Sequence, residues 1–218
     1  MELRDFFAGF WKDLSPEEQA ALEAAAVRRK YQPGEVLHRG GECDSLYAVI
    51  SGRLRVYMLS GEGRQVTLYR LFERDFCLFS ASCILKDIQF DVTVEAEKET
   101  EVYALPSALY QRLMAEKAEV SNFTMALMAS RFTEVMWRME QILSRKLDAR
   151  LAAFLLEESA MEGSLSLRLT HEKIAANLGT AREVVTRLLK YLQSEGLIRV
   201  SRGEIVLLEP KGLQKLAE

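Results

Sequence analysis

Residues 178–196, with the sequence LGTAREVVTRLLKYLQSEG, hold the pattern that says most about the fold of this chain. Gly179 separates two amphipathic segments, and the first of them is predicted to be a short helix over His171–Leu178. Thr180 is expected to cap the second helix, in a capping box with Glu183 three residues later. Two helices that are joined by a tight glycine turn are typical of a helix-turn-helix.

The second helix is expected to pack through one apolar face and to end before a β-hairpin. Gly196 is the glycine that ends it. Ile198–Val200 and Ile205–Leu208 are short β-rich runs on either side of the turn 201–204, and they predict a hairpin wing. The apolar positions with helical spacing are Val184, Val185, Leu188, Leu189 and Leu192. The pattern therefore predicts a winged helix-turn-helix domain over residues 147–218.

The polar residues at the start of the second helix suit contact with DNA. In a helix-turn-helix these positions face the base edges of the major groove. Arginine can bind guanine through two atoms, and glutamate can accept a hydrogen bond from the cytosine amino group. Lys190 and Arg202 are expected to contact phosphates. The predicted DNA-binding residues are Thr180, Arg182, Glu183, Thr186, Arg187, Lys190 and Arg202.

Three alternatives to DNA contact remain open for these residues. Glu183 could serve only the helix cap, and Arg187 with Lys190 could form only a solvated surface. Helix-turn-helix folds also occur as protein-binding modules. A cap, a glycine turn, exposed arginines and a wing occur here in the order of a DNA-binding domain, and this order favours DNA.

The composition is that of an ordinary globular protein and gives DNA binding no support of its own. Of the 218 residues, 49% are hydrophobic and 28% charged. No apolar run approaches the roughly 18–20 residues of a membrane span. The N-terminus shows no secretory signal, so a cytoplasmic protein without a membrane partner is expected. The net charge is −3, and residues 148–218 carry ten basic and ten acidic side chains. Any DNA-binding surface must therefore be local.

Residues 31–105 alternate short β-rich runs with turn residues, and this alternation predicts an antiparallel sandwich or barrel. Examples of the turns are Pro33-Gly34 and Ser51-Gly52. Before this region, Ser15 is expected to cap a helix that begins at Pro16. With the C-terminal helices, the expected fold class is α+β.

A long helix, predicted over about residues 107–146, follows the β-rich region. Its apolar residues alternate at spacings of four and three, as in the a and d positions of a coiled coil. We call this row the dimer seam: Met125, Ala129, Phe132, Met136, Met139 and Leu143. A second stripe, assigned to packing on the β-rich domain, holds Phe123, Leu127, Met128, Val135 and Ile142. The seam predicts a homodimer, and the alternative is a helix inside an internal bundle.

The order of these elements resembles the CRP/FNR family of bacterial transcription regulators. The stretches that carry the resemblance are Pro33–Leu37 with Asp44–Gly52, then Asp148–Leu151, and Leu178–Arg187. The resemblance implies an N-terminal jelly-roll-like β-roll sensor domain over residues 1–146, which includes the dimerisation helix. It places a hinge at 148–150 and the C-terminal winged helix-turn-helix domain at 147–218.

The resemblance also implies an activity for this chain. It predicts a homodimer that binds an inverted-repeat operator and regulates transcription, as activator or repressor, with RNA polymerase as a partner. Arg182, Glu183 and Arg187 match the family's base-reading positions. Thr186 stands where oxygen-responsive members have a base-reading serine.

The sensor departs from the family's cyclic-nucleotide pattern. Where such members grip ribose and phosphate, this chain has Leu78-Phe79-Ser80 and Phe90-Asp91, and Trp137-Arg138 replaces the hydroxyl pair that contacts the base. An acid and a phenyl ring cannot neutralise a phosphate. The predicted effector is therefore not cyclic AMP, and an unknown small molecule, uncharged or aromatic, is expected. The predicted pocket residues are Cys77, Phe79, Phe90, Trp137 and Arg138.

The cofactor remains unknown from the sequence. The chain has three cysteines, Cys43, Cys77 and Cys83, so a four-thiolate iron–sulfur cluster within one chain is not expected. Carbon-monoxide-sensing members place a haem-ligating cysteine near Cys77, although Phe79 stands where they have a histidine. Haem through Cys77, with His38, and a thiol switch of Cys77 and Cys83 are alternatives.

Enzymatic chemistry is not expected from the sequence. The chain shows no nucleophile–base set, no phosphate loop and no metal-spaced group of histidines and cysteines. No catalytic or metal-binding residue is therefore assigned. The remaining alternative of another class is a cyclic-nucleotide-type ligand-binding or protein-docking module without DNA binding.

Overall fold

The computed structural model of the chain describes residues 1–40, 44–61, 63–77 and 91–218. It forms two compact units. The first holds Met1–Met58 and Leu68–Val135, and the second holds Leu59–Thr67 and Met136–Glu218. In the described part of the chain, no helix combines the length and the apolar character that a membrane crossing requires.

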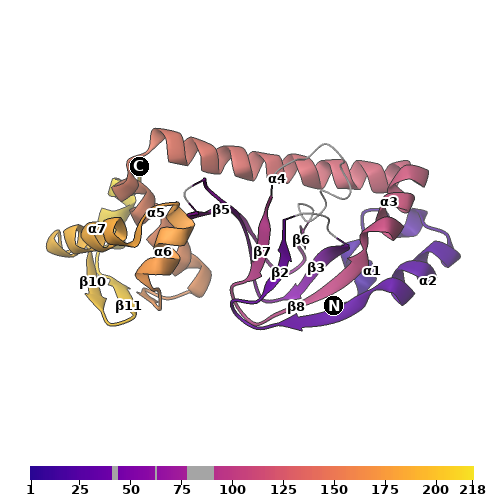
Figure 1. The fold of residues 1–218 in the computed structure, drawn as a ribbon, viewed down its shortest axis with the longest axis horizontal. Coiled ribbons are helices and arrows are strands. Elements are labelled where there is room, and N and C mark those ends of the chain that lie inside the picture. The colour runs from indigo at the N-terminus through magenta and orange to yellow at the C-terminus, as the bar shows by residue number, and fades with distance from the viewer. Residues whose placement is uncertain (41–43, 62, 78–90) are drawn as a thin grey trace. The chain divides into compact units, whose positions relative to one another are not determined.

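Two four-stranded sheets form most of the first unit (Figure 1). The pairs β1–β8, β3–β8, β3–β6, β2–β7 and β4–β7 are antiparallel, which confirms the predicted antiparallel architecture. The first sheet, in spatial order, holds β1 (Val27–Tyr31), β8 (Thr100–Pro106), β3 (Ser45–Ser51) and β6 (Phe76–Cys77). The second holds β2 (Val36–Arg39), β7 (Thr93–Ala96), β4 (Leu54–Leu59) and β5 (Gln65–Leu71).

The turn between β3 and β4 requires glycine. Gly52 has a φ of 94°, a backbone conformation that L side chains rarely adopt. A Cβ at this position would also overlap the carbonyl oxygen of Glu99 and the backbone of Thr100. The predicted turn at Ser51-Gly52 is therefore confirmed. It lies close to the β7–β8 connection, and at both places the chain passes from one sheet to the other.

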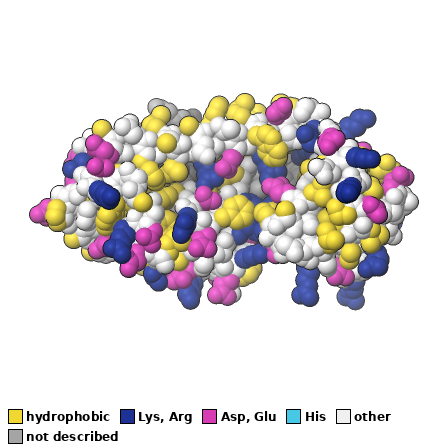
Figure 2. Space-filling model, turned by 180° about the vertical axis from the view of Figure 1, so that it is seen from behind, with side chains coloured by type: hydrophobic (Ala, Val, Ile, Leu, Met, Phe, Trp, Pro, Cys, Tyr) yellow, Lys and Arg dark blue, Asp and Glu magenta, His cyan; other side chains and the backbone are white. Residues whose placement is uncertain are grey.

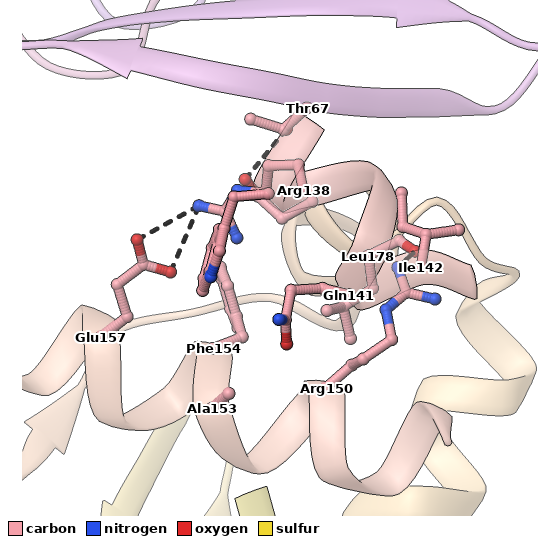
Figure 3. Close-up of a pocket in the computed structure, with 11 residues that line it drawn as sticks. Thr67, Arg138, Gln141, Ile142, Arg150, Ala153, Phe154, Glu157 and Leu178 are labelled. Atoms are coloured by element: carbon pink, nitrogen blue, oxygen red, sulfur yellow. Dashed lines mark hydrogen bonds and ion pairs between the residues drawn. The ribbon is translucent and has the colours of Figure 1, made fainter. Parts of the chain in front are cut away.

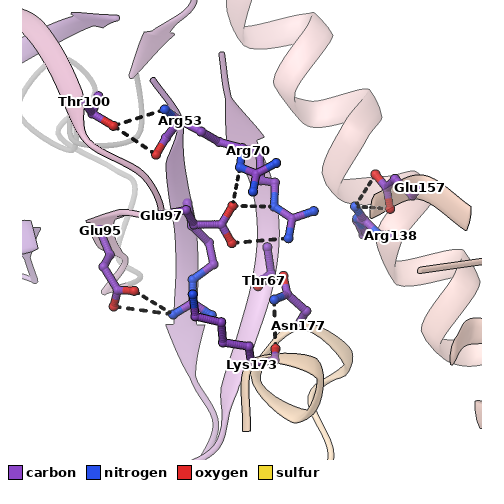
Figure 4. A network of polar contacts seen from close by, with 11 residues as sticks. Arg53, Thr67, Arg70, Glu95, Glu97, Thr100, Arg138, Glu157, Lys173 and Asn177 are labelled. Carbon is purple, nitrogen blue, oxygen red and sulfur yellow. Dashed lines mark hydrogen bonds and ion pairs between the residues drawn. The ribbon is translucent and has the colours of Figure 1, made fainter. Parts of the chain in front are cut away.

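Buried charges join the strands of the second sheet (Figure 4). Arg53 Nε and Arg70 Nε each lie 2.9 Å from Oε2 of Glu97. Arg55 on β4 lies 3.4 Å from Glu95 on β7, directly across the strand pair. Removing one partner of such a network would leave a buried charge without compensation. This network therefore fixes the register of β4 against β7.

The N-terminal helices are α1 (Leu3–Phe6), a 3₁₀ turn (Trp11–Asp13) and α2 (Pro16–Ala25). Ser15 is the N-cap of α2, as predicted: its hydroxyl accepts from the Glu18 amide at 3.3 Å, and the Glu18 carboxylate accepts from the Ser15 amide at 2.7 Å. The hydrogen bond from the Ser15 backbone lowers the pKa of Glu18. An aromatic cluster packs these helices on the first sheet, with Phe6 and Phe7 against Phe76.

The predicted helix over residues 107–146 is two helices, α3 (Ser107–Glu116) and α4 (Ala118–Ser144), and the expectation of one helix is wrong. Lys117 between them has an extended backbone. The chain has no glycine or proline here, so the break comes from tertiary packing. Tyr110 of α3 is buried and its hydroxyl lies 2.8 Å from the Thr124 hydroxyl of α4. This bond requires α3 to fold back beside α4.

Helix α4 has one packed face and one exposed face. Phe123, Leu127 and Met128 pack on the core beneath α1 and α2, and Val135 packs on the core between the sheets. These four confirm the second stripe, whereas Ile142 is 40% exposed. All six residues of the dimer seam are exposed, and Phe132 and Leu143 are 64% and 81% exposed.

The second unit holds α5 (Leu147–Glu162), β9 (Ser166–Leu167), α6 (His171–Leu178), α7 (Arg182–Ser194), β10 (Ile198–Ser201), β11 (Glu204–Leu207) and α8 (Pro210–Ala217). Lys146 is the extended residue before α5. The predicted hinge at Asp148–Arg150 is therefore wrong by a few residues, because this segment forms the first turn of α5. Leu151, Leu155, Ile174, Val185 and Leu189 lie in one buried core that joins α5, α6 and α7.

Candidate nucleic-acid interface

The two helices of the predicted motif are present at the predicted places. Thr170 caps α6, since its hydroxyl accepts from the Lys173 amide at 3.2 Å. Gly179 ends α6 with a φ of 66°. Helix α7 then begins at Arg182. Because the short turn fixes the end of α6 beside the start of α7, the first residues of α7 are presented together at the surface.

The capping box that was predicted for Thr180 is not formed. The N-cap of α7 is Ala181, without a side-chain cap. The Thr180 amide instead donates to the Ala175 carbonyl at 3.1 Å, as part of the turn that closes α6. Helix α7 therefore starts one residue later than expected, and Glu183 occupies its second position, where a capping box is not possible. Glu183 is exposed and is not used as a cap.

Helix α7 is divided between a buried and an exposed face. Val185, Leu189 and Leu192 are at most 1% exposed. The exposed face carries four of the predicted DNA-binding residues: Arg182, Glu183, Arg187 and Lys190. Hence the apolar face fixes the helix on its core while the charged face is left to solvent.

The predicted wing is also present. Strands β10 and β11 pair antiparallel, with Ile198 opposite Leu207 and Ser201 opposite Glu204. Arg202 is exposed at the tip of this hairpin, beside Gly203 with a φ of 78°. An arginine at an exposed loop tip can approach a phosphate without displacing other groups.

Two residues of α6 contact the exposed face of α7, and the sequence analysis did not single them out for this role. Arg182 Nε lies 3.0 Å from the carboxylate of Glu172, and both side chains are about 60% exposed. His171 Nδ1 lies 2.8 Å from the Thr186 hydroxyl. Thr186 is therefore half-buried and hydrogen-bonded, and not exposed as expected. A polar residue in the first turn of α6 is the signal that could have revealed these pairs.

On the face seen in Figure 2, the described residues form no single large basic patch. Figure 2 shows Lys and Arg side chains interspersed with Asp and Glu side chains over the face in view. This agrees with the equal numbers of basic and acidic residues in 148–218. The cations that were predicted to contact DNA, Arg182, Arg187 and Lys190 on α7 and Arg202 on the wing, are all exposed.

The residues of the predicted effector pocket are distributed over the chain. Cys77 lies in the first unit, fully buried in the core between the sheets. Phe79 and Phe90 lie outside the described residues, as do Cys43 and Cys83. Trp137 and Arg138 line a pocket in the second unit (Figure 3). Among the described residues, no group of three or more His, Cys, Asp and Glu side chains could hold a metal ion.

Comparison with known proteins matches both parts of the chain. Residues 28–117 match the model of the cyclic nucleotide-binding domain, and residues 149–216 match that of the Crp-like helix-turn-helix domain. The transcriptional regulator SdrP of Thermus thermophilus is 32% identical over 82% of this chain and 86% of its own length. The cyclic AMP receptor protein of the same organism is 28% identical over 94% of both chains.

A solved structure extends this likeness to three dimensions. The crystal structure of a transcriptional regulator of the CRP/FNR family from Eubacterium rectale is 47% identical, with a TM-score of 0.94, and covers 98% of this chain and 99% of that one. Sequence, domain order and fold thus agree with one family. The chain belongs to the CRP/FNR family of transcription regulators, with a helix-turn-helix DNA-binding domain.

Proposed function

We propose that this regulator acts as a homodimer that places two copies of α7 in successive major grooves of an inverted-repeat operator. The observation that carries the proposal is the exposed charged face of α7, held on a core by the buried residues Val185, Leu189 and Leu192. Two-fold symmetry places the half-sites about 34 Å apart, one helical turn of DNA. Each half-site is expected to hold a G-containing core, near TGA by resemblance to the family.

Three side chains are proposed to select the bases. Arg182 and Arg187 would each bind a guanine, and Glu183 would accept from a cytosine amino group. Lys190 and Arg202 would hold phosphates. Thr186 has a smaller part than the family resemblance implies, because its hydroxyl is already bonded to His171 and to the Arg182 carbonyl.

The dimer is proposed to form along the seam on α4. Large apolar side chains that are as exposed as Phe132 and Leu143 are stabilised when a partner covers them. A second copy of α4 offers the same apolar row, and two such rows pack as a coiled coil. Dimerisation therefore covers the seam and also brings two copies of α7 into one DNA-binding assembly.

The effector is proposed to be a small molecule other than cyclic AMP. Asp91 is exposed and acidic at the position that matches the family's phosphate grip, and an acid there repels a phosphate. One relative of the chain is named a cyclic AMP receptor protein, and the proposal distinguishes this chain from that relative. RNA polymerase is the proposed partner on the promoter. Calorimetry with cyclic AMP should show no binding at micromolar concentrations.

Selection of bound sites from a random duplex library tests the proposal. The wild type should enrich an inverted repeat, and Arg187→Ala should lose preference at one base pair of each half-site, at a cost of about 1–3 kcal/mol. Lys211→Ala is the control, because Lys211 is an exposed cation on α8 of the same unit. If the wild type enriches no inverted repeat, or Arg187→Ala enriches the wild-type half-site, the proposal is wrong.

A further inference from the structure

The second unit contains a pocket of about 300 Å³, which we call the hinge pocket (Figure 3). Its walls come from the end of α4, from α5 and from the end of α6. The lining residues are Thr67, Trp137, Arg138, Gln141, Ile142, Arg150, Ala153, Phe154, Glu157, Asn177 and Leu178, all within that unit. A volume of this size is at the lower end of the range for small-molecule sites.

The charged side chains that line the hinge pocket carry a net positive charge. Its charged residues are Arg138, Arg150 and Glu157. Arg138 Nη2 lies 3.1 Å from the Glu157 carboxylate, and this ion pair cancels one positive charge. Arg150 donates to the Leu178 carbonyl at 2.6 Å. No ion pair within the described part of the chain includes Arg150, so the lining keeps a net charge of +1 from two cations and one anion.

The environment of Arg150 favours an added anion. Burial lowers the pKa of its guanidinium, and the neighbouring charge of Arg138 lowers it further. A half-buried cation that is repelled by a second cation is stabilised when a carboxylate or phosphate accepts its hydrogen bonds. A carbonyl oxygen accepts one of the five N–H groups of a guanidinium, which leaves donors for a ligand.

The remaining walls are flat and largely apolar. Trp137 and Phe154 supply aromatic surfaces, and Ile142, Ala153 and Leu178 supply aliphatic ones. The Arg138 guanidinium lies 5.4 Å from the centre of the Trp137 ring. Figure 3 shows Arg138 and Gln141 of α4 facing Phe154 and Arg150 of α5 across the pocket. Such a combination suits a planar ring that carries one acidic group.

We propose that the hinge pocket binds a small aromatic organic anion, with its acidic group on Arg150 and its ring between Phe154 and Trp137. The acidic group is a carboxylate or a phosphate, which present the same charged oxygens to a guanidinium. The site is separate from the DNA-contacting face of α7. Binding of the anion is measured without DNA. The outcome of this test is therefore independent of the DNA-binding function proposed above.

Calorimetry on the full chain, with three probes, tests the site. Benzoate and phenyl phosphate represent the two acidic groups, and benzamide has the size of benzoate without its charge. At least one of the two anions should bind at about millimolar concentration or below, which is typical of fragment-sized ligands. Benzamide should bind at least about tenfold more weakly, since it lacks the charge that Arg150 would compensate. The stronger anion identifies carboxylate or phosphate as the preferred group.

Four variants locate the binding. Arg150→Gln removes the proposed anion contact, and Arg138→Gln removes the second cation while it leaves the bond from Arg150 to Leu178 in place. Each should weaken anion binding at least about tenfold, equal to about 1.4 kcal/mol. Ala153→Phe should abolish binding by filling the pocket without a change of charge. Lys211→Gln, a charge-matched change outside the pocket, should bind like the wild type.

Thermal melting separates loss of binding from loss of folding. The anion affinity of a variant is compared with that of the wild type only if the variant melts cooperatively. If Arg150→Gln does not fold, Arg138→Gln provides the test of the charged contact. The proposal is overturned if neither anion binds the wild type at about 10 mM. It is overturned equally if benzamide binds as well as benzoate, or if the folded arginine variants and Ala153→Phe bind the anion like the wild type.

Discussion

Nδ1 of His171 lies 2.8 Å from the hydroxyl oxygen of Thr186, so that the first turn of α6 is hydrogen-bonded to the second turn of α7. The Thr186 hydroxyl has one proton, and it donates to the Arg182 carbonyl at 3.0 Å. The imidazole must therefore be the donor to Thr186. This contact fixes the angle between the two helices beside the residues that are proposed to select bases.

The His171–Thr186 contact predicts a measurable coupling. Thr186→Val and His171→Ala should each lower the free energy of unfolding by about 0.5–1.5 kcal/mol, since each removes the same hydrogen bond. The double variant should lose less than the sum, and urea unfolding of the four proteins measures this difference. Thr186→Val should leave the selected half-site unchanged. Additive losses would show that the contact contributes no coupling energy.

The Arg182–Glu172 pair predicts a gain of DNA affinity on mutation. Both side chains are about 60% exposed, so the pair adds little to stability. Glu172 nevertheless holds a negative charge beside a guanidinium that is proposed to bind guanine. Glu172→Gln should therefore bind operator DNA more tightly at low salt, with an unchanged melting temperature. Glu195→Gln, at the other end of α7, is the control. An equal or weaker affinity of Glu172→Gln at low salt would contradict the prediction.

We predict that removal of the Lys190 side chain weakens DNA binding regardless of the DNA sequence. Lys190→Ala should weaken binding to specific and random duplexes by similar factors, because a phosphate contact carries no base information. The slope of log affinity against log salt should fall by about one. Fluorescence anisotropy over a salt series measures both quantities, with Lys211→Ala as the matched loss of a surface cation. A loss confined to one operator sequence would instead assign Lys190 to a base.

The dimer seam predicts loss of the dimer on charge insertion. Phe132→Glu with Met139→Glu places like charges and polar groups along the seam, and burying them is unfavourable. Light scattering should report a monomer. Ser130→Glu with Ser144→Glu adds the same charges to exposed positions of α4 outside the seam and should remain dimeric. A persistent dimer of the seam variant refutes the assignment.

His38 predicts that the first unit loses stability in acid. Burial lowers the pKa of His38 below its ordinary value of 6.5, and the charges of Asp44 and Asp91 oppose this only in part. The unfolded chain therefore binds the proton more readily than the folded one. The stabilising contribution is complete above about pH 6.5 and is lost as the pH falls through the lower, folded-state pKa. Melting temperatures of wild type and His38→Gln should therefore lie close together above this window. Below it the wild type should melt at the lower temperature, because glutamine takes up no proton. Parallel curves across the window would exclude His38 as the cause.

Local chemistry determined much of this fold. Ser15 before Pro16 caps its helix as expected, and Thr170 caps α6 in the same way, because a side-chain oxygen can accept from the unpaired amides of a first turn without tertiary contacts. Gly52 and Gly179 mark turns that require positive φ. The heptad spacing of the seam, and the alternation of α7 between apolar and charged residues, identified the exposed faces of two helices from periodicity alone.

Several helix boundaries and side-chain contacts depend on tertiary packing and could not be predicted from local sequence patterns. The break at Lys117 follows from the burial of Tyr110 against Thr124, and the start of α7 at Arg182 follows from the use of the Thr180 amide to close α6. The pairs His171–Thr186 and Glu172–Arg182 join residues that are distant in sequence. Arg138 of α4 and Arg150 of α5 likewise line the same pocket, the hinge pocket. Sequence patterns describe single helices and turns, whereas contacts between elements depend on the three-dimensional core that orients them.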